Sequence, residues 1–393
     1  MRILWVNPSF SDYRVPVYAE LDRLTGGEFR IVYSKTRMPA RVDAKIREVL
    51  GPRAIGLDGE RSLGLRQEDA HFANTGVRIP YQPDLLTRVL DTKADVVIAE
   101  GFFQWTPAAL AKRQCQRVPL VISYERTAHT ERNCPRWRTL YRRAVVRMTD
   151  AMACNGVLAM EYSKSLGMPA RRITTGQMVV DVASFAKTVT GMSCRERQGI
   201  REQLGVEGPC FLYVGSISQR KGTQALLDAW RRFRGTVAAP ATLLLAGDGP
   251  ERSIIQRGLQ GEDGNVRFLG TVGYDRLPAV YAAADVFVMP TLEDNWSLVV
   301  PEAMACGLPV LCSRYNGCWP ELIQPDRNGW IFDPLKPNEL PDLLKKCLSE
   351  MPALAAMGAS SRRIVNEFTP TTAARSILQA CEIARARRHR ATS

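Results

Sequence analysis

The amino-acid sequence predicts an α/β protein with two doubly wound domains, each built on a parallel sheet. The chain has 393 residues, too many for one ordinary hydrophobic core and enough for two. Short apolar runs, typical of buried parallel strands, alternate along it with segments of helical periodicity. The composition is that of a globular protein, with 45% apolar and 24% charged residues.

The charge of the chain narrows the classes of partner. The formal net charge is +13 and the isoelectric point is about 9.4. An excess of this size suits nucleic acid, an anionic membrane surface or a phosphorylated substrate. The sequence has no zinc finger, helix-turn-helix or aromatic-basic RNA motif, so we expect no nucleic-acid partner. The net charge does not distinguish an anionic membrane surface from a phosphorylated substrate as the partner.

The ten cysteines and the N-terminal residues indicate the cellular compartment in which we expect the protein. The cysteines form no CxxC pair and no Cys/His cluster, so we expect reduced thiols and no zinc site. No apolar run is long enough to span a bilayer, and MRILWVNPSF resembles a strand rather than a signal peptide. We therefore expect a cytoplasmic protein, with peripheral contact at the inner face of the membrane as the alternative.

The first domain is expected over residues 1–180. Its strands are predicted at Arg2–Val6, Phe29–Tyr33, Asp95–Ala99, Pro119–Ser123, Ala151–Cys154 and Ile173–Gly176. Its helices are predicted at Tyr13–Leu24, Gln82–Leu90, Pro107–Arg113 and Val157–Leu166. Residues 35–81 show no clear period. The first loop lacks GxGxxG, so we expect no dinucleotide there, and its candidate ligand residues are Ser9, Ser11, Tyr13 and Arg14.

A basic stretch lies between Lys112 and Arg147. It holds ten Lys and Arg residues against two acids, Glu125 and Glu131. Interleaved Trp137 and Leu140 indicate a basic amphipathic helix, which could contact an anionic membrane or a lipid-phosphate acceptor. A solvated helix face explains the pattern equally well.

The second domain is expected over residues 181–370. Its strands are predicted at Pro209–Val214, Thr242–Ala246, Val266–Gly270, Val286–Met289 and Pro309–Cys312. Helices are predicted at Thr223–Arg234, Tyr274–Ala284 and Ser297–Cys306, with later ones from about Asn338 and Ala353. Tyr315–Gly317 and Asn328–Trp330 are predicted turns. A last helix is expected over 371–388, and residues 384–393 are expected to form a disordered basic tail.

Two loops of this domain contain candidate binding residues. Ligands of open α/β sheets bind beyond the carboxyl ends of the strands, where both loops should lie. In the first, Gly215 and Gly222 flank the basic pair Arg220 and Lys221, which suits a diphosphate. The second carries Glu293 and Asp294, with Glu302 one turn into the following helix. The alternative for these acids is a structural one, since carboxylates favour helix N-termini.

The second loop and its helix resemble a known family signature. In the retaining nucleotide-sugar glycosyltransferases of family 4, a Glu, seven residues and a second Glu precede Ala-Met-Ala-x-Gly-x-Pro-Val. Here Asp294, the seven residues Asn295–Pro301, and Glu302 with AMACGLPV have that spacing. This chain has Asp for the first Glu and Ser297 where Gly is usual. The resemblance implies the GT-B fold, in which two Rossmann-like doubly wound domains face each other across a cleft and a C-terminal helix (371–393) crosses back to the first domain.

The resemblance also implies roles for individual residues. Glu302 would hold the ribose hydroxyls, and Asp294, or Glu293 beside it, would meet the donor sugar. His129, in YERTAHTERN, would contact that sugar too, with Glu125 and Glu131 as alternates for the acceptor. The remaining donor-binding residues would be Lys221, Arg220, Gly215, Ser216, Gly249, Leu269, Asn295, Trp296, Ser297 and Leu298.

The implied activity is transfer of a sugar, with retention of configuration, from a UDP- or GDP-sugar to a hydroxyl acceptor. The acceptor would be a glycan or a lipid-linked glycan, bound by the first domain. The chain has no Asp-x-Asp, so we expect no metal and no cofactor beyond the nucleotide sugar. A sugar phosphorylase, a nucleotide-sugar epimerase of the same fold and a non-enzymatic nucleotide-sugar-binding protein are the alternatives.

Overall fold

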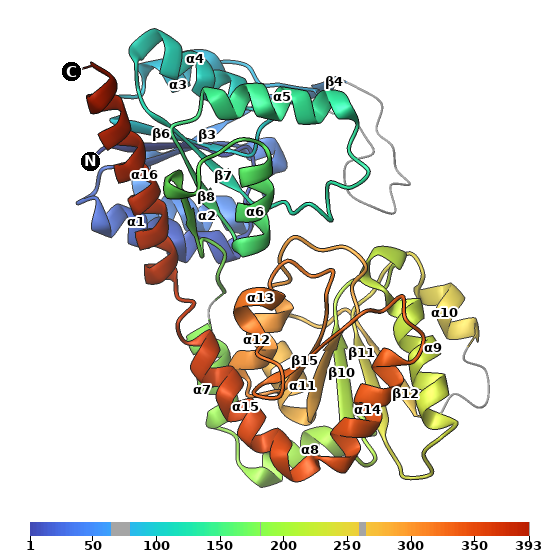
Figure 1. Cartoon of the computed structure of the whole chain (residues 1–393). Coiled ribbons are helices and arrows are strands. Elements are labelled where there is room, and N and C mark those ends of the chain that lie inside the picture. The colour runs from blue at the N-terminus through green and yellow to red at the C-terminus, as the bar shows by residue number, and fades with distance from the viewer. Residues whose placement is uncertain (64–78, 181, 259–264, 393) are drawn as a thin grey trace. The chain divides into compact units, whose positions relative to one another are not determined.

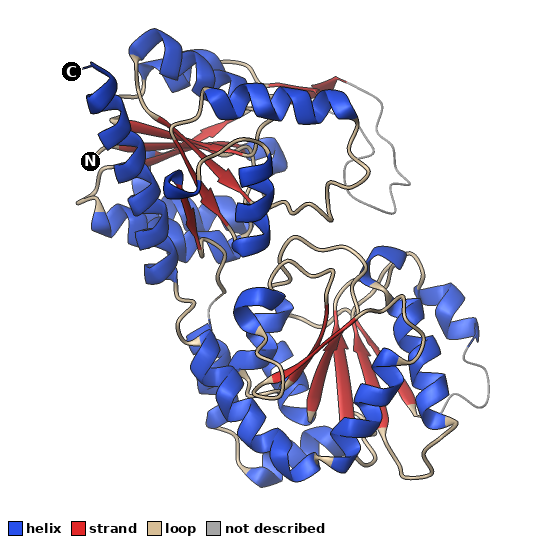
Figure 2. Ribbon diagram, in the orientation of Figure 1, coloured by secondary structure: helices blue, strands red, loops and turns tan. Residues whose placement is uncertain are grey.

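The computed structural model of the chain describes residues 1–63, 79–180, 182–258 and 265–392 (Figure 1). Two compact units make up the chain. Unit 1 comprises Met1–Val179 and Phe368–Ser393, and unit 2 comprises Val180–Glu367. In each unit, helices cover both faces of a parallel sheet (Figure 2), which is the arrangement of a doubly wound fold.

Unit 1 is built on a seven-stranded parallel sheet. Its strand order is β3-β2-β1-β6-β7-β8-β9. The strands are β1 (Ile3–Val6), β2 (Phe29–Ser34), β3 (Ala54–Leu57), β6 (Val96–Glu100), β7 (Leu120–Tyr124), β8 (Ala151–Cys154) and β9 (Ile173–Thr175). A separate antiparallel pair joins β4 (Arg61–Leu63) to β5 (Ile79–Tyr81).

The strands of unit 1 alternate their side chains between two apolar cores. On β1, Ile3 and Trp5 enter one core, while Leu4 and Val6 enter the other, as the two-residue period requires. The first core is covered by α1 (Val15–Leu24), α2 (Ala40–Leu50) and α16 (Pro370–Thr392). The second is covered by α3 (Leu85–Asp91), α4 (Thr106–Gln116), α5 (Arg136–Arg147) and α6 (Val157–Ser165).

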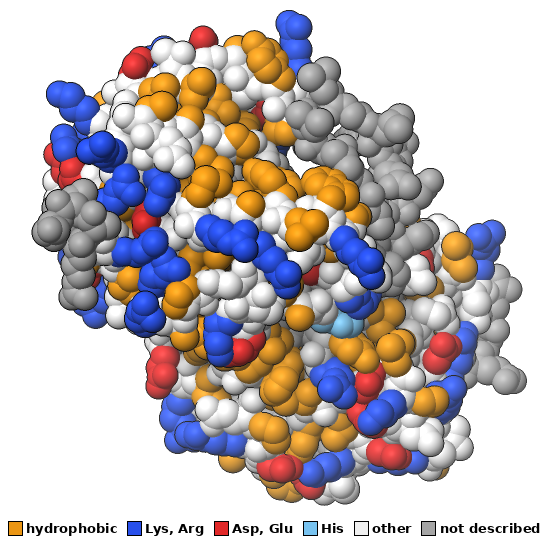
Figure 3. All heavy atoms as spheres, turned by 45° about the horizontal axis from the view of Figure 1, so that its top comes forward, with side chains coloured by type: hydrophobic (Ala, Val, Ile, Leu, Met, Phe, Trp, Pro, Cys, Tyr) orange, Lys and Arg blue, Asp and Glu red, His pale blue; other side chains and the backbone are white. Residues whose placement is uncertain are grey.

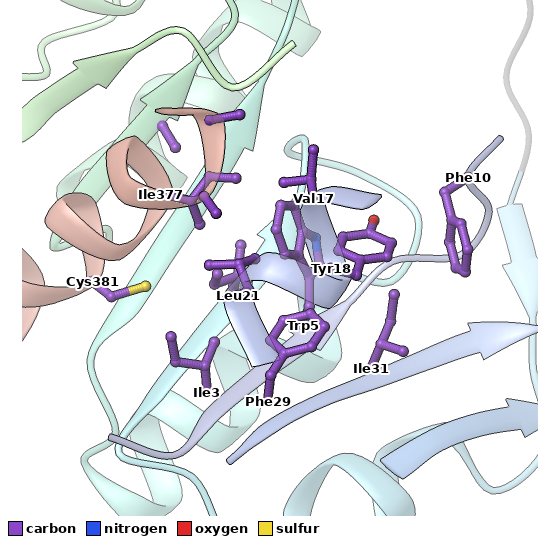
Figure 4. Close-up of a cluster of buried hydrophobic side chains, with 14 of the residues drawn as sticks. Ile3, Trp5, Phe10, Val17, Tyr18, Leu21, Phe29, Ile31, Ile377 and Cys381 are labelled. Atoms are coloured by element: carbon purple, nitrogen blue, oxygen red, sulfur yellow. The ribbon is translucent and has the colours of Figure 1, made fainter. Parts of the chain in front are cut away.

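The C-terminal helix α16 packs on unit 1, as predicted, although it follows unit 2 in the sequence (Figure 1). Figure 4 shows Ile377 and Cys381 of α16 beside Leu21 of α1 and Ile3 of β1. The prediction of a disordered tail from residue 384 is wrong, because the helix continues to Thr392. Its last turns are held by an ion pair that the periodicity could not reveal: Arg387 Nη1 lies 2.8 Å from Oδ1 of the buried Asp150.

Unit 2 contains a six-stranded parallel sheet. The strand order is β12-β11-β10-β13-β14-β15. The strands are β10 (Cys210–Val214), β11 (Thr242–Ala246), β12 (Val266–Gly270), β13 (Val286–Met289), β14 (Val310–Ser313) and β15 (Gly329–Phe332). The predicted turn at 328–330 is therefore wrong in part, since Gly329 and Trp330 begin the sixth strand.

Helices surround the sheet of unit 2. They are α7 (Val182–Thr190), α8 (Cys194–Gln203), α9 (Thr223–Arg234), α10 (Arg252–Gly258), α11 (Leu277–Ala283), α12 (Val299–Ala305), α13 (Trp319–Leu322), α14 (Glu339–Ser349) and α15 (Met351–Val365). In α9 the apolar residues recur at helical spacing and are buried, so the sequence placed both ends of this helix correctly.

In both units the order of strands reverses beside a central strand. The reversal lies between β1 and β6 in unit 1, and between β10 and β13 in unit 2. Loops that leave the carboxyl ends of two such neighbours diverge to opposite faces of the sheet, so they leave a crevice for ligands. Each unit therefore has one preferred place for a binding site.

Candidate functional site

The two candidate loops of unit 2 lie at its switch point. Residues 215–222 follow β10 and residues 290–298 follow its neighbour β13. The backbone carbonyl of Arg220 accepts hydrogen bonds from the amides of Leu292 (2.9 Å) and Glu293 (3.2 Å). It also accepts one from Thr291 Oγ1 (3.1 Å). These three bonds fix the basic loop to the acidic one.

A glycine allows this close approach. Gly222 has φ +70°, and a Cβ there would lie 2.1 Å from the carbonyl oxygen of Pro290. Any larger residue would push the loops apart, so the sequence needs glycine here for contact as well as for backbone conformation.

Asp294 and Lys221 form an ion pair across the two loops. Lys221 Nζ contacts Asp294 Oδ2, which also accepts a hydrogen bond from Ser297 Oγ. Burial alone would raise the pKa of the Asp294 carboxyl, but Lys221, Ser297 and nearby Arg220 outweigh it and lower that pKa. Asp294 is therefore ionised at neutral pH despite its burial. The predicted first acid and the predicted phosphate-binding lysine lie together.

A turn after β14 supports the acidic loop. The Asp294 amide donates to the Tyr315 carbonyl (3.3 Å), and the Gly317 amide donates to the Asp294 carbonyl (3.0 Å). The side chain of the buried Asn316 accepts from the Ser297 amide at 3.3 Å. The sequence predicted this turn but gave Asn316 no role, because its only signal was an amide inside an Asn-Gly turn.

Glu302 lies in α12 and pairs with a residue that the sequence did not single out. The hydroxyl of Tyr281, on α11, donates to Glu302 Oε2 at 3.0 Å. Tyr281 is fully buried and Glu302 is 5% exposed. Burial raises the pKa of the Glu302 carboxyl to about 7, although the Tyr281 hydrogen bond opposes the rise. Glu302 therefore changes charge near neutral pH.

Four other predicted donor residues lie near the basic loop 215–222. Gly215 and Ser216 belong to it, Gly249 lies on the loop after β11, and Leu269 lies on β12. Gly215 follows β10, and a Cβ at Gly247 would lie 1.9 Å from the Gly215 carbonyl oxygen. A Cβ at Gly249 would lie 2.3 Å from the carbonyl oxygen of Ile217. The Ser216 side chain is exposed beside them, and Leu269 is half-buried on β12. This packing explains why residues 247–250 read Gly-Asp-Gly-Pro, since both glycines lie in close contact with the neighbouring loop.

Residues 293–298 form the connection into α12. Glu293 is 2% exposed, Trp296 is 5% exposed and Leu298 occupies the N-cap of α12. The carbonyl oxygen of Asn295 lies where a side chain at Gly317 would stand, 1.8 Å from its Cβ. The connection is therefore held rigidly between β13 and the Asn316 turn.

His129 belongs to unit 1, in the loop between β7 and α5. Thr127 and Thr130 form a hydrogen-bonded turn around it, with the Thr127 amide 3.0 Å from Thr130 Oγ1. Glu131, an alternate for the acceptor, is 6% exposed and ion-pairs with Arg142 at 2.6 Å. This geometry assigns Glu131 to holding the loop on α5. His129 and Glu125 are both half-buried.

Two further findings concern metals and membranes. Among the described residues, no group of three or more His, Cys, Asp or Glu side chains is arranged to hold a metal ion. Over the same ranges, no helix combines the length and the apolar character needed to cross a membrane. His71 lies outside the described residues.

Residues 208–350 match a model of the glycosyl transferases group 1 family. This segment runs from β10 through α14 and contains all the candidate residues of unit 2. Over this segment, which is less than half of the chain, the protein is similar to the glycosyl transferases group 1 family. The resemblance of the motif around Glu302 is thereby confirmed at the level of the family.

Curated relatives match parts of this chain. The sulfoquinovosyl transferase SQD2 of Arabidopsis thaliana is 24% identical over 79% of this chain and 61% of its own length. The O-antigen chain mannosyltransferase B of Escherichia coli is 34% identical over 31% of this chain and 32% of its own length. A GDP-mannose-dependent phosphatidylinositol monomannoside mannosyltransferase of Mycobacterium tuberculosis is 31% identical over 42% of this chain and 44% of its own length. The chain thus spans less than two thirds of each of these relatives.

Solved structures share the fold of this chain. Anabaena HepE in complex with UDP has a TM-score of 0.72 at 18% identity, over 96% of this chain and 99% of that one. WaaG, a glycosyltransferase involved in lipopolysaccharide biosynthesis, has a TM-score of 0.65 at 15% identity, over 97% of this chain and 99% of that one. This likeness confirms the predicted GT-B fold.

Proposed function

We propose that the protein is a retaining glycosyltransferase that moves a sugar from a nucleotide-sugar donor to a hydroxyl group of a glycan or lipid-linked acceptor. The observation that carries the proposal is the pairing of Asp294 with Lys221 at the switch point of unit 2, inside the segment of the family match. Curated glycosyltransferases among the relatives and the UDP complex of HepE support the same activity.

The donor would be held by charge and hydrogen bonding. The Glu302 carboxylate can accept both ribose hydroxyls, as an ionised carboxylate offers two acceptor oxygens. Lys221 has three donors, so it can keep Asp294 and still contact a diphosphate oxygen. Arg220 adds a second positive charge on the same loop. Asp294 and the backbone of Asn295–Leu298 would then meet the hydroxyls of the sugar.

The reaction would need stabilisation of the leaving diphosphate. Lys221 and Arg220 supply positive charge where negative charge develops, which is the usual way in which enzymes lower such barriers. We propose that these cations act without a bridging metal ion. Retention of configuration is proposed from the family motif, with the acceptor hydroxyl attacking from the side that the nucleotide leaves and His129 close to the donor sugar.

We also propose a peripheral membrane contact through α5, at the inner face of the membrane. Trp137 and Leu140 are 51% and 64% exposed, and they lie among exposed Arg136, Arg143 and Arg147. Figure 3 shows basic side chains interspersed with hydrophobic ones on the face that it draws. Other basic residues of the stretch turn inward: Arg138 and Arg142 face the ring of Phe103. The proposed membrane-contact surface of α5 is thus smaller than the basic stretch between Lys112 and Arg147.

A donor panel tests the proposal. The full chain is incubated with UDP-, GDP- and ADP-sugars, with and without EDTA, and thermal shift and nucleotide release are measured. We expect one donor to stabilise the protein and to be hydrolysed slowly, with no effect of EDTA. Lys221→Ala should lower the rate of nucleotide release by roughly 10²-fold, the usual loss when a stabilising charge is removed.

Other outcomes would favour the alternatives. Conversion of the donor to an isomer without acceptor would indicate an epimerase, and tight binding without turnover would indicate a binding protein. Full activity of Lys221→Ala would refute the assigned role in diphosphate stabilisation.

A further inference from the structure

The switch point of unit 1 carries a polar cluster that the donor site does not use. β1 ends at Val6 and β6 ends at Glu100, and these strands are neighbours at the reversal of strand order. The cluster consists of Asn7, Arg14, Glu100 and Glu125, with Tyr13 at its edge. Polar side chains gathered at such a position in an otherwise apolar sheet indicate a ligand.

Glu100 is the centre of this cluster. Its Oε2 accepts hydrogen bonds from Trp5 Nε1 (3.1 Å) and Asn7 Nδ2 (3.4 Å). Asn7 is itself held by Tyr18, whose hydroxyl oxygen lies 2.9 Å from Asn7 Nδ2. The Glu100 side chain keeps 22% of its surface exposed. The carboxylate is therefore oriented by buried neighbours while solvent still reaches it, as a preorganised binding group requires.

Arg14 is the cation of the cluster. Its side chain is 3% exposed, and its Nη2 lies 3.7 Å from Glu100 Oε1, too far for a hydrogen bond. Its Nη1 donates to the carbonyl of Gln177 at 3.4 Å. The guanidinium also lies 5.8 Å from the ring centroids of Trp5 and Tyr13. Arg14 thus faces the Glu100 carboxylate at ion-pair distance without donating a hydrogen bond to its Oε1.

The charges of the cluster decide which ligand suits it. Glu100 and the nearby Glu125 bring two carboxylates to the Arg14 guanidinium. Burial and the charge of Glu125 raise the pKa of Glu100, while Arg14 opposes the rise. A phosphate would meet two like charges here, whereas hydroxyl groups can donate to the carboxylate oxygens. The ring of Tyr13 adds an apolar face of the kind on which a sugar can lie.

We propose that the Glu100 cluster binds the hydroxyl groups of an uncharged sugar, which is the reacting end of the acceptor. This inference rests on the proposed glycosyltransferase function and specifies its acceptor. The +13 net charge of the chain suggests an anionic partner, whereas this cluster suits an uncharged group. Any anionic part of an acceptor therefore has to bind outside the cluster.

Binding to the full-length chain without donor tests the inference. The probes are the methyl glycosides of glucose, galactose and mannose at up to 50 mM, and the 6-phosphates of the same sugars, followed by saturation-transfer NMR. We expect at least one methyl glycoside to bind, and none of the phosphates to bind more tightly than its uncharged counterpart. Glu100→Gln should weaken that binding about tenfold or more, the usual effect of losing a hydrogen bond to a charged group.

Controls separate binding from folding. Gln keeps a carbonyl for Trp5 Nε1 but removes the charge that faces the buried Arg14, so binding by Glu100→Gln is measured well below its melting temperature, where circular dichroism shows the folded state. Glu161→Gln removes an exposed carboxylate of the same unit, in α6, and should leave glycoside binding unchanged. Tighter binding of the phosphates, no binding of any methyl glycoside, or equal binding by Glu100→Gln would overturn the inference. Glycoside binding without any donor turnover would instead refute the proposed function.

Discussion

Substitution of Tyr281 by Phe removes one hydrogen bond to Glu302, a residue of the proposed donor site. The hydroxyl that it removes lies 3.0 Å from Glu302 Oε2, and both side chains are buried. The ring remains, so the packing of α11 on α12 is kept. The variant therefore changes the ionisation of Glu302 more than it changes the fold, and its effect should depend on pH.

The size of the effect follows from the pKa of Glu302. With a pKa of about 7, the carboxyl is half ionised at pH 7 and about one-tenth ionised at pH 6. A hydrogen bond to a charged group contributes about 1.5–3 kcal/mol, so its loss raises the pKa by roughly one to two units. At pH 7 the ionised fraction then falls from about one half to between roughly a tenth and a hundredth. Donor affinity should fall by about 5- to 50-fold.

The sign of the pH dependence is fixed by the same argument. Because the carboxylate is the form that we propose to accept the ribose hydroxyls, wild-type affinity should rise from pH 6 to pH 8 and then level off. In Tyr281→Phe this rise should move to higher pH. Cys306 also lies near the pair, and burial raises the pKa of its thiol, so it stays neutral over this pH range.

Calorimetric titration with the stabilising nucleotide sugar between pH 6 and pH 8.5 measures this shift. Tyr33→Phe is the matched control, since the Tyr33 hydroxyl also contacts a carboxylate, that of Asp43, but in unit 1. It should leave donor affinity unchanged. A wild-type affinity that does not vary with pH, or an equal loss in Tyr281→Phe at pH 6 and pH 8.5, would refute the reasoning.

Three other predictions concern separate parts of the chain. Gly317→Ala should lower the melting temperature of unit 2 and weaken donor binding, because its Cβ would lie 1.8 Å from a backbone oxygen. Asp150→Ala should destabilise unit 1 by about 3–5 kcal/mol in urea unfolding, since it leaves buried positive charge uncompensated. The double variant Trp137→Ala with Leu140→Ala should lose binding to anionic liposomes at physiological salt, measured by sedimentation, and keep donor hydrolysis.

Each of these has a control. Gly199→Ala, in α8 with open space around its Cβ, should be neutral or should stabilise the protein by up to about 1 kcal/mol. Asp12→Ala removes a carboxylate that pairs with exposed Arg41 and Lys45, and should cost no more than about 1 kcal/mol. Leu86→Ala removes an exposed leucine of α3 and should not affect liposome binding. An equal effect of test and control in any pair contradicts the corresponding argument.

The parts of the fold that the sequence predicts well are those with strong local patterns. β11, β13 and α9 have the predicted bounds because continuous apolar runs and a helical stripe leave little choice. β12 also has the predicted bounds, although the exposed Arg267 interrupts its apolar residues. The helix α2 was missed because it buries only Val42, Ile46 and Leu50 among charged residues. In β15 the glycine that signals a turn also begins the strand, so local chemistry could not separate the two.

The candidate site divides in the same way. Asp294 and Glu302 are visible because the spacing between them is local and resembles a family signature. Tyr281 is not visible, because it reads as one more apolar position of α11 and meets Glu302 only when two helices pack. Glu131 looked equivalent to Glu125 until packing placed it against Arg142. Hydrophobic periodicity predicts helices and strands, but it does not predict which side chains of distant elements come into contact.

The membership of α16 in unit 1 has a consequence for synthesis. The first core of unit 1 needs Ala373, Ile377 and Cys381, which leave the ribosome only after all of unit 2 has been made. Until then, the apolar side chains of α1 and β1 lack their cover, while Val180–Glu367 is already a continuous segment with its own sheet. The usual N-to-C order of domain maturation is therefore reversed: the later half can fold first, and the earlier half depends on the last helix to be protected from aggregation.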